Sequence, residues 1–236
     1  SKIQLIVKDA GRTLIQVVDD GKGMSFKDAR LCFERHATSK LNTADDLFRL
    51  TTKGFRGEAL ASIAAIAHVE LKTKMADENT GTQLLIEGSE VKEHTMTACN
   101  DGTSISVKNL FFNVPARRNF LKSDSVEFSH IEEEFYRVSL THCNLSFSLF
   151  HNGKAVLQLK PSNLKIRIVS VFGDHFKDKL YPIEQNTDFM NISGFIAKPE
   201  NAKKKKSEQY MFINHRFIKH WNRRKHGITM KSVIHN

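Results

Sequence analysis

The feature that most constrains the fold is a carboxylate that leaves a predicted strand directly before two closely spaced glycines. The alternating segment from Thr13 to Val18 predicts a strand, and it forms a hairpin with the earlier alternating segment from Lys2 to Asp9. Asp19 ends this strand, and Gly21 and Gly23 follow it. Glycine lacks a Cβ, so the backbone can turn tightly there and approach a ligand closely. Because an ionised carboxylate only accepts hydrogen bonds, this strand end predicts a site for a ligand with an exocyclic amine.

Two polar segments after this strand suit the phosphates of a nucleotide. The segment from Thr38 to Lys40 offers hydroxyl groups and an ammonium group to phosphate oxygens. The segment from Gly54 to Leu60 opens a helix predicted over Gly57 to Ala67, and the free N–H groups at a helix start attract phosphate. The polar stretch between them, Ala37 to Lys53, is interpreted as a mobile lid rather than as an ordinary surface connection.

The remaining segments predict helices and strands without a regular alternation of the two. Strands are expected over His68 to Lys74, Thr82 to Glu87 and Thr103 to Leu110, and an amphipathic helix over Ser125 to His142. This order predicts an α/β fold: a two-layer α/β sandwich, in which a mixed, mainly antiparallel sheet has helices on one face. We expect a domain boundary at Pro161-Ser162-Asn163.

A fourth motif joins the three above. It comprises Asp101-Gly102-Thr103 and, after Val107, the segment Asn109-Leu110-Phe111-Phe112-Asn113-Val114-Pro115-Ala116-Arg117-Arg118. In this order and at these intervals, the motifs closely resemble the MutL DNA mismatch-repair family. That family lies within the superfamily of gyrase, the ninety-kilodalton heat-shock chaperone and histidine-kinase ATPases.

The resemblance covers about residues 1 to 220 and implies two domains. Residues 1–160 correspond to an ATP-binding sandwich, and residues 161–220 to a smaller α/β domain, with DNA-binding and transducing roles, that is cut short. Residues 221–236 do not look like the helix that the family has at this point, so we expect an atypical tail there.

The resemblance also implies the residues that bind the nucleotide. They are Asp19, Gly21, Gly23, Thr38, Ser39, Lys40, Gly54, Phe55, Arg56, Gly57, Glu58, Ala59, Leu60 and Thr103. For Thr103, contact with adenine and an ordinary strand threonine are equally good interpretations. The implied cofactors are ATP and Mg²⁺. The family's catalytic glutamate and the asparagine that holds Mg²⁺ lie on a helix before the first strand. We therefore expect the catalytic residues upstream of Ser1, no metal ligand in this chain, and no ATP hydrolysis by the chain as given.

The balance of charge points to an anionic partner. The chain has 36 Lys and Arg residues against 26 Asp and Glu residues, a net charge of +10. The residues expected to contact DNA are Arg117, Arg118, Lys203, Lys204, Lys205 and Lys206. These clusters have no interleaved aromatic residue, so we expect contact with the phosphate backbone, independent of sequence and without base stacking.

The resemblance implies partners and a location for the full-length protein. ATP would drive the N-terminal halves to form a homodimer, which carries the signal from a mismatch-bound MutS-like protein to excision partners. The cysteines are far apart, and no apolar run approaches the about 20 residues that span a bilayer, so a reduced cytosol is expected. The resemblance implies that this cytosol is bacterial. Two alternatives stay open: a non-enzymatic DNA-binding module on the same fold, and another ATPase of the superfamily, such as a type II topoisomerase. The Phe-Arg-Gly-Glu-Ala-Leu and Asn-x-Pro-Ala-Arg-Arg motifs favour MutL over the topoisomerase.

Overall fold

The computed structural model describes residues 1–35, 57–187, 191–197, 209–218 and 232–235. The chain divides into two compact units. Unit 1 comprises Ser1–Glu133 and Leu145–Lys160, and unit 2 comprises Glu134–Asn144 and Pro161–Asn236. The segments of each unit are therefore not continuous in the sequence, and each unit is described by itself.

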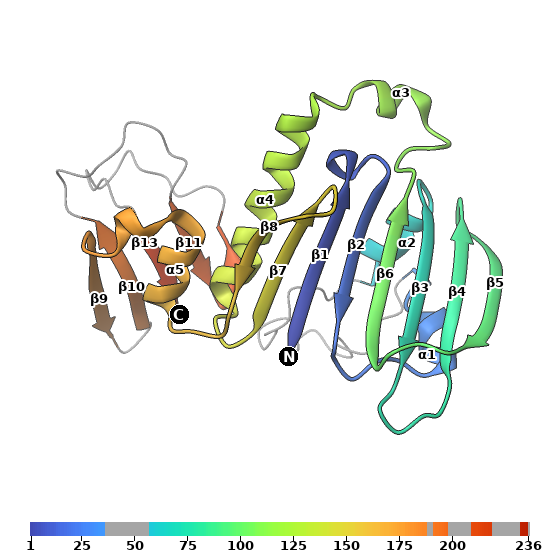
Figure 1. The fold of residues 1–236 in the computed structure, drawn as a ribbon, viewed down its shortest axis with the longest axis horizontal. Helices are drawn as coiled ribbons and strands as arrows, with labels where there is room; N and C mark the ends of the chain where they lie inside the picture. The colour runs from blue at the N-terminus through green and yellow to red at the C-terminus, as the bar shows by residue number, and fades with distance from the viewer. Residues whose placement is uncertain (36–56, 188–190, 198–208, 219–231, 236) are drawn as a thin grey trace. The chain divides into compact units, whose positions relative to one another are not determined.

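Unit 1 is built on an eight-stranded sheet with the order β5-β4-β3-β6-β2-β1-β7-β8 (Figure 1). The strands are β1 (Lys2–Lys8), β2 (Leu14–Asp19), β3 (His68–Lys74), β4 (Gly81–Glu87), β5 (Glu90–Thr97), β6 (Gly102–Lys108), β7 (Ser146–His151) and β8 (Lys154–Leu159). Neighbouring strands are antiparallel except β1 and β7, which are parallel. The predicted mixed, mainly antiparallel sheet is confirmed.

Turn chemistry explains two of the hairpins. β1 and β2 are joined by the short 3₁₀ helix η1 (Asp9–Gly11), where Gly11 has a φ of +89°. β7 and β8 are joined at Asn152 and Gly153, both with positive φ (50° and 79°). Asn-Gly is the pair that two-residue hairpin turns favour, because both residues tolerate the left-handed region.

Helices α1 (Phe26–Leu31) and α2 (Ala59–Ala64) bury their small residues against β3 and β4, behind the sheet in the view of Figure 1. The shared core consists of Ala29, Phe33, Ala64, Ala67, Val69, Leu71, Leu84 and Ile86. In β3 and β4 the core residues alternate with partly exposed ones, as expected for strands with one buried face. The predicted layers, a sheet with helices on one face, are therefore present here.

The remaining helices of unit 1 follow β6. They are the short α3 (Pro115–Asn119) and the first part of α4 (Asp124–Thr141). Phe128 of α4 stacks on His151 of β7, with ring centroids 3.8 Å apart. Pro115 begins α3, because a proline at the first helical position lacks only an N–H that would have no helical partner.

Unit 2 combines the end of α4 with α5 (Leu164–Phe172), η3 (Asp174–Phe176) and a five-stranded sheet. The strands are β9 (Leu180–Asn186), β10 (Asn191–Ala197), β11 (Tyr210–Ile213), β12 (Arg216–Phe217) and β13 (Ser232–His235), in the order β12-β11-β13-β10-β9. Asn163 caps α5 by accepting from the Ile166 N–H at 2.9 Å, and Gly173 ends the helix. The core of the unit is Leu140, Ile168, Phe176, Leu180, Tyr210 and Phe212.

Candidate functional site

The end of β2 lies in one row with residues of two neighbouring strands. Asp19 of β2 is directly opposite Thr103 of β6, and Thr103 is directly opposite Thr73 of β3. Residues that face each other in this way share one face of the sheet, so their side chains are close enough to interact. The structure thus brings together Asp19 and Thr103, which are far apart in the sequence and were both predicted site residues.

The turn after Asp19 is held by its own carboxylate. The Gly21 N–H donates to Asp19 Oδ1 at 2.9 Å. A Cβ on Gly21 would lie 2.6 Å from the same oxygen, so a larger residue there would disturb this bond. The turn keeps one carboxylate oxygen occupied, and no hydrogen bond to Oδ2 is present among the described residues. Asp19 therefore has an acceptor to offer a ligand.

Gly23 and Gly102 allow close approach between parts of the backbone. Gly23 has a φ of +69°, and a Cβ on it would lie 2.0 Å from the Lys74 carbonyl oxygen. Gly102 has a φ of +100°, and its Cβ would lie 2.1 Å from the Asp19 carbonyl oxygen. The sequence predicts that a ligand approaches the backbone closely at Gly23. In the structure, what Gly23 approaches is the end of β3, so its absent side chain has a structural cause as well.

Thr73 belongs to the same row, although the sequence motifs do not include it. It is 0% exposed, and its hydroxyl contacts Gly102, Met24 and Thr103 at 2.9, 2.9 and 3.2 Å. Its place in the strand pattern could have indicated it. Val69, Leu71 and Thr73 alternate on the buried face of β3, and Thr73 is the polar residue among them. Since buried hydroxyls are normally hydrogen-bonded, such a residue indicates a specific polar contact.

Asp20 has a structural partner. Its Oδ1 accepts from the Lys2 N–H at 2.6 Å, and its own N–H donates to the Lys2 carbonyl at 3.3 Å. These bonds hold the start of β1 beside the end of β2. Asp19 and Asp20 thus have different roles. Asp19 lies opposite Thr103, and Asp20 holds the start of β1.

The start of α2 contains the described part of the predicted phosphate motif. Gly57 has a φ of +66°, and Glu58 is the residue before the helix, with its carbonyl accepting from the Ser62 N–H at 3.0 Å. The helix itself begins at Ala59 and is six residues long, shorter than the predicted helix over Gly57 to Ala67. Leu60 packs against the core of α1, α2, β3 and β4, so its side chain is committed to packing.

Several predicted residues lie outside the described part of the chain. They are Thr38, Ser39, Lys40, Gly54, Phe55 and Arg56 of the nucleotide set, Lys203, Lys204, Lys205 and Lys206 of the DNA set, and the predicted lid over Ala37 to Lys53.

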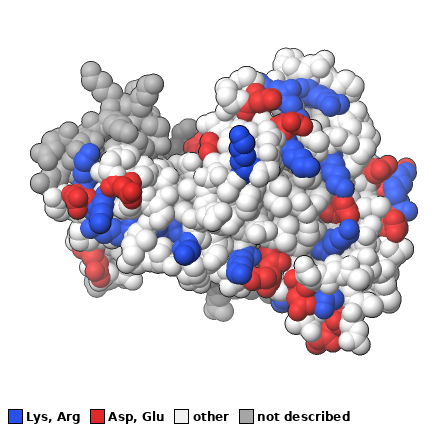
Figure 2. Space-filling model, in the orientation of Figure 1, with Lys and Arg blue, Asp and Glu red and all other residues white. Residues whose placement is uncertain are grey.

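Arg117 and Arg118, the described members of the expected DNA-binding set, lie on α3 and are exposed. Within the described residues, no ion pair involves either arginine. Figure 2 shows Lys and Arg side chains over the part of unit 1 where Figure 1 labels α3, with acidic side chains beside them. Phe120 follows α3 directly and is 86% exposed, so an exposed aromatic side chain lies next to these arginines in the sequence.

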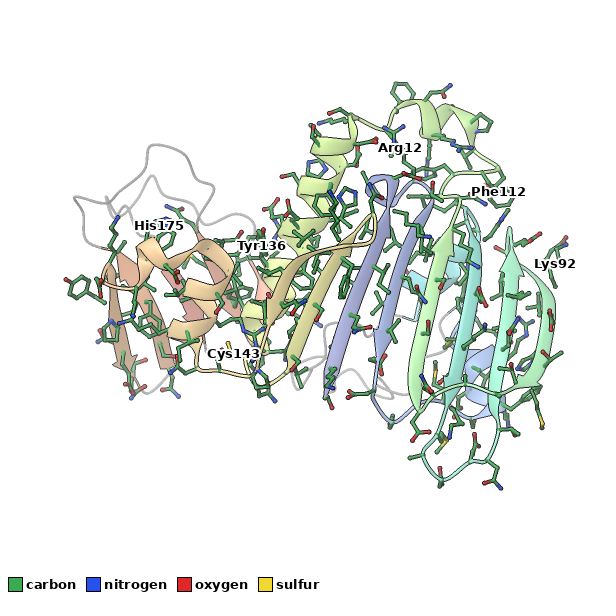
Figure 3. The ribbon with its side chains drawn as sticks, viewed as in Figure 1. Arg12, Lys92, Phe112, Tyr136, Cys143 and His175 are labelled. Atoms are coloured by element: carbon green, nitrogen blue, oxygen red, sulfur yellow. The ribbon has the colours of Figure 1, made fainter. Side chains whose placement is uncertain are left out.

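The segment that carries α3 is anchored at both ends. Before the helix, the Asn113 side chain donates to the Ala65 carbonyl at 2.9 Å. After it, Arg12 donates to the Lys122 carbonyl and pairs with Asp124 at 3.1 Å. Arg12 and Phe112 both lie at the end of the sheet that α3 follows (Figure 3). The exposure of Phe120 is therefore a property of a fixed segment.

The described residues include three free cysteines and no cluster of metal-ligating side chains. They contain no group of three or more His, Cys, Asp and Glu side chains that could hold a metal ion. Cys32, Cys99 and Cys143 are free, and burial raises the pKa of the Cys32 thiol to about 11. Among the helices of the described part, none combines the length and the apolar character that crossing a membrane requires.

Comparison with known proteins identifies the family. Residues 168–227 match the family model of the DNA mismatch repair protein, C-terminal domain. The chain is 61% identical over 219 residues to DNA mismatch repair protein MutL of Christiangramia forsetii, and 60% identical over 219 residues to that of Flavobacterium psychrophilum. In both cases the match covers 93% of this chain and 36% of the relative, so the chain spans about a third of their length.

A solved structure has the same fold. The Aquifex aeolicus MutL ATPase domain, complexed with ADP, superposes with a TM-score of 0.69 at 25% sequence identity. The match covers 94% of this chain and 76% of that one. The chain belongs to the MutL DNA mismatch-repair family and corresponds to its ATPase region with part of the domain that follows.

Proposed function

We propose that the chain binds ATP at the end of β2, with Asp19 as the acceptor for the adenine amino group. The observation that carries the proposal is the row formed by Asp19 and Thr103 beside the turn at Gly21. The carboxylate and its neighbouring hydroxyl are brought together by strand pairing. A guanine keto oxygen would face the lone pairs of Asp19, so the site favours adenine. The related Aquifex aeolicus domain, which was solved with ADP, supports a nucleotide at this fold.

The phosphates are assigned to the segments that follow. In this proposal Thr38, Ser39, Lys40 and Arg56 contact phosphate oxygens, and the backbone from Gly54 to Leu60 donates N–H groups to them. Hydrolysis is proposed for the full-length protein, as a slow reaction that resets a switch. Mg²⁺, where bound, would neutralise phosphate charge. The described residues provide no cluster to hold it.

The wider function is mismatch repair. In the full-length protein, ATP binding promotes homodimer formation, and the dimer links a MutS-like mismatch-recognition protein to excision in the bacterial cytosol. The chain contributes non-specific contacts to DNA through Arg117 and Arg118 on α3 and through the run from Lys203 to Lys206. The net charge of +10 and the two exposed arginines support this part of the proposal.

Calorimetric titration of the purified chain with ATP and with GTP tests the assignment. The informative variant is Asp19→Asn, because an amide can still accept from the Gly21 N–H while it presents an NH₂ group to the ligand. We expect this variant to lose about 1.5–3 kcal/mol of ATP binding, which exceeds tenfold in Kd. Glu90→Gln, which removes an exposed carboxylate on the edge strand β5, is the matched control. Equal affinity of the wild-type chain for ATP and GTP, or unaltered ATP binding by Asp19→Asn, would refute the proposal.

A further inference from the structure

The Thr73 hydroxyl is the centre of three polar contacts. It is 2.9 Å from the Gly102 carbonyl oxygen and 2.9 Å from the Met24 N–H nitrogen. It is also 3.2 Å from the Thr103 hydroxyl. Thr73 is 0% exposed, so no bulk water competes for these contacts. The three neighbours belong to β6 and to the turn after β2, the two elements that form the candidate site.

The number of protons available decides the direction of each bond. A hydroxyl donates one hydrogen bond and accepts two. The Gly102 carbonyl can only accept, so Thr73 donates to it. The Met24 N–H can only donate, so Thr73 accepts from it. With its proton committed to Gly102, Thr73 can bond to Thr103 only by accepting. All three contacts are hydrogen bonds at the same time only when Thr103 is the donor.

We propose that Thr73 is a positioning residue that sets the polarity of the site by holding the proton of Thr103. With that proton directed at Thr73, the Thr103 hydroxyl has only lone pairs left for a ligand. Asp19, directly opposite Thr103, also offers only lone pairs. The row therefore presents acceptors to the ligand and no donor. It selects a purine with an amino group at the six-position over one with a keto oxygen, whether the contact is direct or through a water.

The inference deepens the proposed function, since it rests on a purine nucleotide binding at the end of β2. It makes a residue that does not touch the ligand responsible for part of the specificity. A threonine in place of an apolar residue at the end of β3 would otherwise serve only to satisfy Gly102 and Met24. The two roles differ in what they predict, because a purely structural role does not depend on which purine is bound.

Titration with ATP and with inosine triphosphate, which carries a keto oxygen at the six-position, separates the roles. Thr73→Val keeps a branched side chain and removes the hydroxyl, which frees the Thr103 proton to point at the ligand. We expect the preference of the wild-type chain for ATP to exceed about tenfold, and Thr73→Val to reduce that preference by about fivefold. Thr73→Ser, which keeps the hydroxyl, should restore the wild-type ratio. Thr82→Val is the matched control, because Thr82 faces Thr73 on β4 and is 3% exposed.

Each outcome is decisive. Equal weakening of both nucleotides by Thr73→Val, or a serine variant with the valine ratio, overturns the inference and leaves the proposed function intact. If the wild-type chain binds neither nucleotide, the proposed function fails and the inference with it. Thermal melting shows whether Thr73→Val folds. If it does not, Thr103→Val, at a half-buried position, serves instead: it must reduce the preference for ATP, and an unchanged ratio overturns the inference.

Discussion

At the residue scale, the candidate site depends on two glycines, because a side chain at either position would collide with the neighbouring backbone. Gly23 and Gly102 lie where a Cβ would meet the backbone of a neighbouring strand end. The glycines thus allow the turn after β2 to pack against β3 and β6, and this packing places Asp19 opposite Thr103. The sequence predicts that glycines belong here. It does not predict which backbone they approach, because that depends on the order of the strands.

Substitution at Gly23 should therefore destabilise the fold more than its backbone conformation alone requires. Gly153 provides the matched control, since it has a φ of +79° with nothing within 4 Å of the added Cβ. We expect Gly153→Ala to lower the free energy of unfolding by about 1 kcal/mol, and Gly23→Ala by about 3 kcal/mol or more. Urea denaturation measures both. Similar losses of unfolding free energy in the two variants would show that the clash of the added Cβ with the Lys74 carbonyl does not destabilise the fold.

At the scale of the elements, local signals were predictable and non-local pairing was not. The hairpin at Asn152-Gly153 and the cap of α5 at Asn163 are encoded within a few residues, because each depends on local turn or capping chemistry. The parallel pairing of β1 with β7 joins segments far apart in the sequence, and no local pattern predicts it. The exposed position of Phe120 is likewise set by the anchoring of the segment around α3 rather than by its own sequence.

The α3 arginines should contribute to DNA binding through phosphate contact. Neutralising Arg117 with Arg117→Gln should weaken binding to a duplex and reduce the slope of log affinity against log salt by about 0.9, as expected for one lost phosphate contact. Lys92→Gln on the edge strand β5 removes an equal charge and is the control. Fluorescence anisotropy over a salt series, with two unrelated duplexes, measures the slopes. An affinity insensitive to salt would contradict the assignment.

Phe120 adds a second arm to that experiment. If its exposed ring stacks on an unpaired base, Phe120→Ala should cost about 1–3 kcal/mol with a single-stranded oligonucleotide and leave the duplex affinity unchanged. Neither Arg117→Gln nor Phe120→Ala should change the affinity for ATP. Thr103 and Lys108 are separated by roughly 17 Å along β6, and α3 follows the far end of that strand. Equal binding of the oligonucleotide by wild type and Phe120→Ala would support contact with phosphates alone.

At the scale of the whole molecule, the sequence predicts the family and the sheet of unit 1. It does not predict which segments of the chain make up unit 2. The order of the motifs is specific enough to indicate the family, because several uncommon segments must occur at set intervals. Unit 2 includes the second half of α4 and the strand β13, neither of which the sequence indicates as part of it. Its sheet places β13, from the segment expected to be an atypical tail, between β10 and β11. Such a placement depends on long-range pairing, which patterns in a single sequence do not encode.

We propose that ATP binds where β2 ends, and hydrogen–deuterium exchange tests this location directly. Exchange of backbone amides should slow on addition of ATP in peptides that cover residues 19–24 and 102–104, because the ligand orders the turn and the start of β6. GTP at the same concentration should give much less protection, and peptides from the edge strand β5 should be unchanged with either nucleotide. Protection that is equal with ATP and GTP, or that appears elsewhere in the chain while residues 19–24 and 102–104 exchange as before, would contradict the account.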